Sequence, residues 1–274
     1  MSGLPWRFHP VLLLLVGGLV VVQIATTSGT RRRDAVAAGL LLLIAVSWPL
    51  GDLAARVSVL AATLQRLVLL LAWAPLWLRS LSPDLVARLT RPALVDALAR
   101  RLAHPVVAVL VVTVVGTLTL LTPVVDEGAR SSLVRAGVLA LTVVTGVVLW
   151  LPVVGLVPGA TRLSALARAG YLFVASLVVT SFSLVWIFAR HPLYPALQGQ
   201  RAILGLSPLL DQQLAGYLAK LGAYVPLWIS AFVIFSRADR TGRADEAPLH
   251  WADVERHFER SRRRSRRDDP HPGG

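Results

Sequence analysis

The sequence predicts an all-α membrane protein, a bundle of seven transmembrane helices with the N-terminus outside and the C-terminus in the cytoplasm. Two observations carry the fold class. The chain is 55% hydrophobic with a mean hydropathy of +0.65, and long uninterrupted apolar runs recur along its 274 residues. Such a composition is typical of multi-pass membrane proteins and excludes an ordinary soluble domain. A third observation, the distribution of arginine between loops, predicts the orientation.

The apolar runs set the predicted spans, because a hydrocarbon core of roughly 30 Å takes about 20 apolar residues per helix. They are residues 10–27, 35–50, 57–78, 105–121, 133–157, 170–189 and 209–235. The second span is short and would extend by tilting or by using its flanks. Together the spans define a membrane domain over residues 1–236.

Alternate loops differ in arginine content. Most arginines fall in one set of loops, at 31–33, 79–101, 162–168 and beyond 235. The positive-inside rule places this set in the cytoplasm. The first apolar run also has features of a cleaved signal peptide, but the arginines at 31–33 directly after it favour a retained span.

Two basic segments are predicted on the cytoplasmic side. Residues 82–103 alternate apolar and arginine positions at near-helical spacing, which predicts a helix on the membrane surface. Residues 237–274 form a basic tail that we expect to be largely disordered. Neither segment resembles a nucleic-acid-binding module, so we expect the lipid bilayer, and no nucleic acid, as a partner.

The last span is unusually polar. The stretch LLDQQLAGYLAKLGAYVPLW, residues 209–228, contains Asp211, Gln212, Gln213 and Lys220. At helical spacing one face carries a polar stripe and the next a stripe of small residues, respectively Gln213, Tyr217, Lys220, Tyr224 and Ala215, Ala219, Ala223. Small residues let another helix approach closely. This span is therefore predicted to lie inside the bundle.

The third span carries a second buried cation, Arg66, next to Gln65. A charge at mid-bilayer costs about 2.5–3.5 kcal/mol, so Arg66 and Lys220 must face the interior, water or a partner. We expect an ion pair between Arg66 and Asp211, direct or through water. Interhelical contact without any chemical role is the alternative for these residues.

No motif indicates an enzyme. The chain has no cysteine and its single methionine is Met1, and it lacks a phosphate-binding loop, a metalloprotease helix and a serine-hydrolase elbow. We therefore predict no catalytic residue and no cofactor.

The stretch LSPLLDQQLAGYL, residues 206–218, resembles the Asp-Gln-Gln-x-x-Gly signature of the CtaG family of cytochrome c oxidase assembly factors, with Gly216 as its glycine. Residues 51–78, HPLYP at 191–195 and GVVLWLPVVG at 146–155 are further similarities. The resemblance implies a seven-span protein of the bacterial plasma membrane, from a family implicated in copper delivery to the oxidase.

The chain departs from that family at the histidines. Members carry His-Met-x-x-His in the third span, where this sequence has Ala62 to Arg66. Further family histidines near 121–123 and in the fifth span are also missing, with Arg135 and Leu139 in the corresponding positions. A guanidinium does not coordinate a metal. The resemblance thus implies a degenerate member without a metal site, and His9 and His191 are the remaining metal candidates.

We therefore expect a non-enzymatic membrane protein that assists assembly or stability of a respiratory oxidase without binding copper. Its partner would be an oxidase subunit or another assembly protein. Its polar core would comprise Asp211, Gln212, Gln213, Gly216, Gln65, Arg66 and Lys220. One alternative is a transporter or channel for an anion or small solute, lined by Arg66 and Lys220. Another is a copper chaperone that uses His9 and His191.

Overall fold

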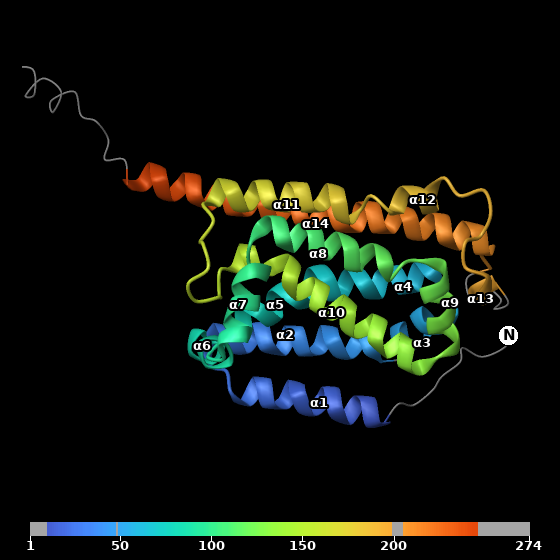
Figure 1. The fold of residues 1–274 in the computed structure, drawn as a ribbon, viewed down its shortest axis with the longest axis horizontal. Coiled ribbons are helices and arrows are strands. Elements are labelled where there is room, and N and C mark those ends of the chain that lie inside the picture. Colours follow the sequence, from blue (N-terminus) through green and yellow to red (C-terminus); the bar gives the residue numbers. More distant parts are fainter. Residues whose placement is uncertain (1–9, 48, 199–204, 246–274) are drawn as a thin grey trace, which may run out of the picture.

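The chain folds as a bundle of helices that run between two ends of the molecule (Figure 1). The structure is a computed structural model and describes residues 10–47, 49–198 and 205–245, in which no strand occurs. The all-α class is thus confirmed for this part of the chain. The helices are α1 (Pro10–Ala25), α2 (Gly29–Val46), α3 (Leu50–Arg56), α4 (Val59–Leu67), η1 (Val68–Trp73), α5 (Ala74–Ser80), α6 (Pro83–Leu89), α7 (Ala93–Leu102), α8 (Pro105–Leu118), α9 (Thr122–Arg130), α10 (Ser132–Val154), α11 (Ala165–Val179), α12 (Ser183–Ile187), α13 (Pro195–Gln198) and α14 (Pro208–Asp245).

Four of the described helices or helix runs are long and apolar enough to cross a bilayer: Val59–Ser80, Ser132–Val154, Ala165–Ile187 and Pro208–Arg240. The helices α7 and α8 meet this criterion only as a pair bent by 86°. The apolar part of α1, Val16–Ala25, is shorter. The predicted count of seven spans therefore stays a prediction.

Residues 82–103, predicted as one surface helix, form the two short helices α6 and α7. The bend after α7 sets this helix nearly perpendicular to α8, and α7 buries none of its residues. The basic tail beyond residue 245 lies outside the described residues.

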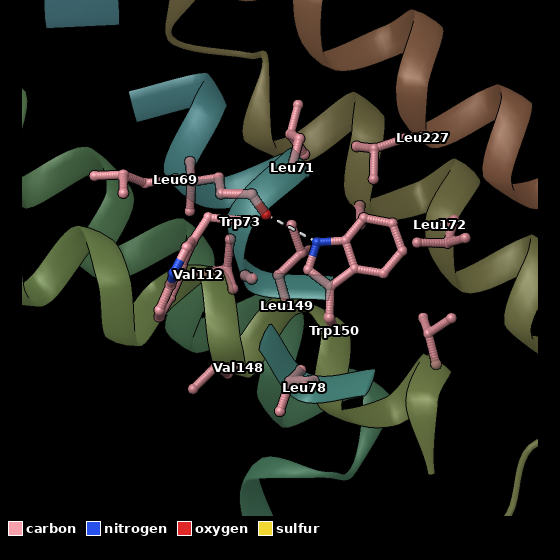
Figure 2. Packing of buried hydrophobic residues seen from close by; sticks show 14 of the residues in the cluster. Leu69, Leu71, Trp73, Leu78, Val112, Val148, Leu149, Trp150, Leu172 and Leu227 are labelled. Atoms are coloured by element: carbon pink, nitrogen blue, oxygen red, sulfur yellow. Dashed lines mark hydrogen bonds between the residues drawn. The ribbon is translucent and has the colours of Figure 1, made fainter. Parts of the chain in front are cut away.

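The core of the bundle forms where η1 and α5 meet α10 (Figure 2). Here α4 continues into η1 as a π-helical segment within one apolar run. The Trp150 indole of α10 donates a hydrogen bond of 2.8 Å to the Leu70 carbonyl oxygen of η1. A Cβ on Gly146 would lie 3.1 Å from the Leu69 carbonyl oxygen, so glycine permits this close crossing. Leu149, Leu172 and Leu227 complete the core from α10, α11 and α14.

The basic loops gather at one end of the bundle, beside α6 and α7 (Figure 1). Arg79 at the end of α5 forms an ion pair with Asp34 of α2 at 3.2 Å, and Arg31 and Arg33 line the same surface hollow. Gly159, in the loop after α10, lies against the Arg100 side chain of α7. The loops grouped by their arginine content are thus neighbours in space. We call this the α6–α7 end, and the opposite one, with α3, α9 and α13, the α9–α13 end.

Candidate functional site

The signature segment at the start of α14 ties this helix to the start of α4. The carboxylate of Asp211 accepts hydrogen bonds from Ser58 Oγ at 2.6 Å, Val59 N at 2.7 Å and Leu60 N at 3.4 Å. The first backbone N–H groups of a helix lack intrahelical acceptors and carry partial positive charge. Asp211 supplies both the acceptor and the compensating negative charge to α4.

The two glutamines of the signature hold the segment between α12 and α13. Gln212, which is 1% exposed, accepts a hydrogen bond of 2.8 Å from Leu193 N through Oε1. Gln213 donates from Nε2 to the Ala189 carbonyl oxygen at 3.1 Å. In the described part of the chain, Nε2 of Gln212 has no hydrogen-bond partner. Each amide side chain thus forms a hydrogen bond with a backbone group of a loop, which has no partner within a helix or strand.

The glycine of the signature lies where α14 crosses α12. A Cβ on Gly216 would stand 2.8 Å from Ile187 Cγ1 and 3.0 Å from the Ser183 carbonyl oxygen. These distances are shorter than ordinary van der Waals contact, so only glycine fits without a shift. We call Asp211, Gln212, Gln213 and Gly216 the α14 junction, because they join α14 to α4, α12 and the segment 188–194.

The α9–α13 end is closed by the segment that follows α12. Tyr194 accepts a hydrogen bond of 2.8 Å from Trp186 Nε1 and donates one of 3.0 Å to the Leu120 carbonyl oxygen. Burial raises the pKa of Tyr194 to about 12, so its hydroxyl keeps the proton that it donates. Ala196 N donates to Asp126 of α9 at 3.1 Å. The segment is thus fixed to the turn that follows α8 and to α9.

Arg66 and Asp211 have separate hydrogen-bond partners, so the direct ion pair expected between them was wrong. Its guanidinium donates from Nη2 to the Gly116 carbonyl oxygen at 3.3 Å and to Thr119 Oγ1, at the end of α8. Asp211 binds the first turn of α4, and Arg66 lies seven residues further along this helix, about 10 Å away at 1.5 Å per residue. The sequence could not show that the carboxylate is used as a helix cap.

Of the two stripes on α14, the stripe of small residues is the more deeply buried. Ala215 and Ala223 are buried, whereas Tyr217 is 52% exposed and Lys220 is half-buried, with its Nζ 4.9 Å from the centre of the Tyr224 ring. Gln213 and Tyr224 are half-buried too, so of the four residues of the polar stripe only Tyr217 is exposed. Gln65, by contrast, joins two helices: it donates to the Ala45 carbonyl oxygen of α2 at 2.7 Å.

A cavity of about 440 Å³ lies between α4, α8, α9, α10 and α12, and Arg66 and Arg135 both line it. Arg135 donates to the Gly128 carbonyl oxygen at 3.0 Å, and Asp52 of α3 is the acid in the lining. Lys220 is not among the lining residues, so the predicted wall of Arg66 and Lys220 does not form. We call this space the arginine cavity.

Arg135 is a cavity residue that the sequence analysis noted only for the family histidine it replaces. It stands within the predicted span 133–157 but was not included in the predicted polar core. In the structure it belongs to α10 and lines the cavity. Its position inside a predicted span, which also distinguished Arg66, was the available signal.

The predicted pairing of the metal candidates His9 and His191 is not tested by the described residues. His191 is exposed on the segment between α12 and α13, and His9 lies outside the described residues. Among the residues that the structure places, no group of three or more potential metal ligands occurs.

Apolar helices of bilayer length, joined by buried polar contacts near one end, define a multi-pass integral membrane protein. The model of the cytochrome c oxidase caa3 assembly factor family matches residues 20–241. The chain belongs to this family. No curated protein sequence and no solved structure matches it.

Proposed function

We propose that the protein acts by binding, as a non-enzymatic factor that helps a respiratory oxidase to assemble or remain stable in the bacterial plasma membrane, without holding copper itself. Membership of the oxidase assembly factor family supports a role in oxidase assembly. The donor set of the arginine cavity supports the absence of resident copper, and the contacts of the α14 junction support a role as a binding scaffold.

The donor set of the arginine cavity does not fit copper. Besides a histidine near 121–123, the resemblance assigns family histidines to positions 62, 66, 135 and 139, and these four positions line this one cavity. They are occupied by Ala62, Arg66, Arg135 and Leu139, which offer neither imidazole nor thioether. Two guanidiniums would also repel a cation from the same space.

The α14 junction is the single observation that carries the binding role. Asp211 caps α4, the two glutamines fix the segment 188–194, and Gly216 sets the crossing with α12. These contacts define the shape of the α9–α13 end while the metal donors are lost. Signature residues that serve internal contacts, beside a cavity without metal donors, fit a protein that acts by recognising an oxidase subunit or another assembly protein.

The test is copurification combined with genetic complementation. A tagged protein is expected to retain oxidase subunits or other assembly proteins, and its deletion is expected to lower the amount of assembled oxidase. Asp211→Asn should complement poorly, whereas Glu127→Gln, which changes an exposed acid at the same end, should complement fully. Normal oxidase levels in the deletion strain would contradict the proposal.

Metal analysis tests the copper-free part separately. Purified protein exposed to copper and then washed with a chelator is expected to retain a small fraction of one copper ion per chain. Stoichiometric copper after the wash would overturn this part and leave the assembly role intact.

A further inference from the structure

We propose that the arginine cavity binds an organic anion with an apolar body, such as a carboxylate or phosphate ester on a hydrocarbon chain. This inference does not depend on the oxidase role. It rests on the charges in the cavity, on the hydrogen-bond donors that remain there, and on the apolar character of the other walls.

Arg66 is the cation that carries the charge argument. Among the described lining residues, Arg66 and Arg135 are the basic ones and Asp52 is the acidic one. Within the described chain, the hydrogen-bond partners of Arg66 are a carbonyl and a hydroxyl, both neutral. The end of α8 offsets part of its charge through the helix dipole but supplies no counter-ion. A buried cation without a counter-ion favours an anionic ligand.

Arginine supplies the donors for such a ligand. The lining hydroxyls of Thr63, Thr142 and Thr145 donate to carbonyl oxygens of their own helices, at 2.8, 2.8 and 2.6 Å. Tyr194 likewise donates to the Leu120 carbonyl oxygen. Arg66 uses only Nη2 in its two hydrogen bonds, so the N–H groups on Nε and Nη1 remain for a ligand. A guanidinium is well suited to carboxylate and phosphate oxygens.

The other walls are chiefly apolar and select the rest of the ligand. They include Val112, Val124, Leu139 and Phe182, from α8, α9, α10 and the turn before α12. The volume of about 440 Å³ lies within the range of about 300–1,000 Å³ that is usual for small-molecule sites. A hydrated inorganic anion would leave these walls uncovered, whereas a hydrocarbon body would cover them.

The test measures binding of dodecanoate, dodecanol and inorganic phosphate to the full-length protein in an uncharged detergent. The wild-type protein is expected to bind dodecanoate at one saturable site, and dodecanol and phosphate at least tenfold more weakly. Equal affinity for dodecanoate and dodecanol would overturn the anionic part of the proposal. Phosphate binding as strong as dodecanoate binding would overturn the apolar part. Both comparisons use the wild-type chain, so they do not depend on the folding of a variant.

Three variants locate the site. Arg66→Gln and Arg135→Gln are each expected to weaken dodecanoate binding at least tenfold, because each removes one cavity guanidinium. Lys220→Gln removes a charge from a membrane helix outside the cavity and is expected to leave the affinity unchanged. Unchanged affinity in both arginine variants would place the binding elsewhere and overturn the assignment.

Mass spectrometry of molecules that copurify with the protein distinguishes two sources of the ligand. An anionic lipid retained by the wild-type and Lys220→Gln proteins but lost from Arg66→Gln would identify a membrane lipid. Dodecanoate binding without such a lipid would identify a soluble organic acid. Either result supports the proposed chemistry.

Discussion

At the scale of single residues, Asp211 shows how a charged group is accommodated in an apolar helix. Its carboxylate is 9% exposed and accepts hydrogen bonds from one hydroxyl and two backbone N–H groups. These donors belong to the start of α4, where partial positive charge gathers. The acid is therefore stabilised by a helix terminus rather than by a basic side chain.

We predict that Asp211→Asn lowers the free energy of unfolding by about 1–2 kcal/mol, because the amide keeps the shape but loses the charge and one acceptor. Thermal unfolding in detergent measures the change. Glu127→Gln is the control, since Glu127 is exposed at the same end, and it should shift the midpoint little. Equal midpoints for wild type and Asp211→Asn would show that the cap contributes nothing.

Arg66 is stabilised differently from Asp211, because its partners are neutral groups at the end of a helix. A cation at mid-bilayer costs about 2.5–3.5 kcal/mol on the insertion scale, and neutral partners at the end of α8 offset part of this cost. Alanine or leucine at this position would cost less. Such a cost at one position is typical of a functional residue, which agrees with the proposed ligand.

At the scale of helices, the close crossing of two helices depends on glycine at the point of contact. We predict that Gly216→Ala lowers the free energy of unfolding by about 1–3 kcal/mol, because the new methyl would stand 2.8 Å from Ile187 Cγ1 and 3.0 Å from a backbone oxygen. Thermal unfolding again measures the effect.

Gly170 of α11 offers a matched control for this substitution. A Cβ at Gly170 meets nothing within 4 Å, so Gly170→Ala should leave stability unchanged or raise it by up to about 1 kcal/mol. The two alanine substitutions should thus act in opposite directions. A shift of the same sign and size in both would contradict the crossing at Gly216.

The π-helical segment η1 makes a second helix-scale prediction. Trp150→Phe removes the indole donor to the Leu70 carbonyl oxygen and is expected to cost about 1–3 kcal/mol, since an apolar core offers no replacement donor. Trp77→Phe changes a half-buried indole that stacks on Trp73, and it should cost less. A larger loss in Trp77→Phe would mean that ring stacking, not the hydrogen bond, stabilises η1.

At the scale of the whole molecule, the clustered arginine loops lead to a prediction about orientation. The chain has no cysteine, so a single introduced cysteine reports its own location. We predict that a membrane-impermeant maleimide labels Glu127→Cys in intact cells and labels Thr161→Cys only after lysis. Both positions are exposed, at the α9–α13 and α6–α7 ends respectively. The opposite pattern would reverse the assigned orientation.

The sequence predicted what depends on local pattern. Apolar runs predicted the all-α class, and the Asp-Gln-Gln-x-x-Gly stretch pointed to the family that residues 20–241 match. It did not predict η1, which lies inside a continuous apolar run, or the break between α11 and α12, where Thr180, Ser181 and Ser183 stand within one predicted span. The partner of Asp211 was also missed. Its contact with Val59 spans 152 residues, and neither periodicity nor charge counting reports such a distance.

The contact between Asp211 and the start of α4 has a consequence for biogenesis. The ribosome adds about 5–20 residues per second, so the acid emerges roughly 8–30 s after the N–H groups that it caps, 152 residues earlier. During that interval the N-terminal N–H groups of α4 lack the carboxylate acceptor that they have in the folded protein. A helix made late in synthesis therefore completes an early one, and a nascent chain that stops short of Asp211 exposes an unfinished helix end to quality-control proteases.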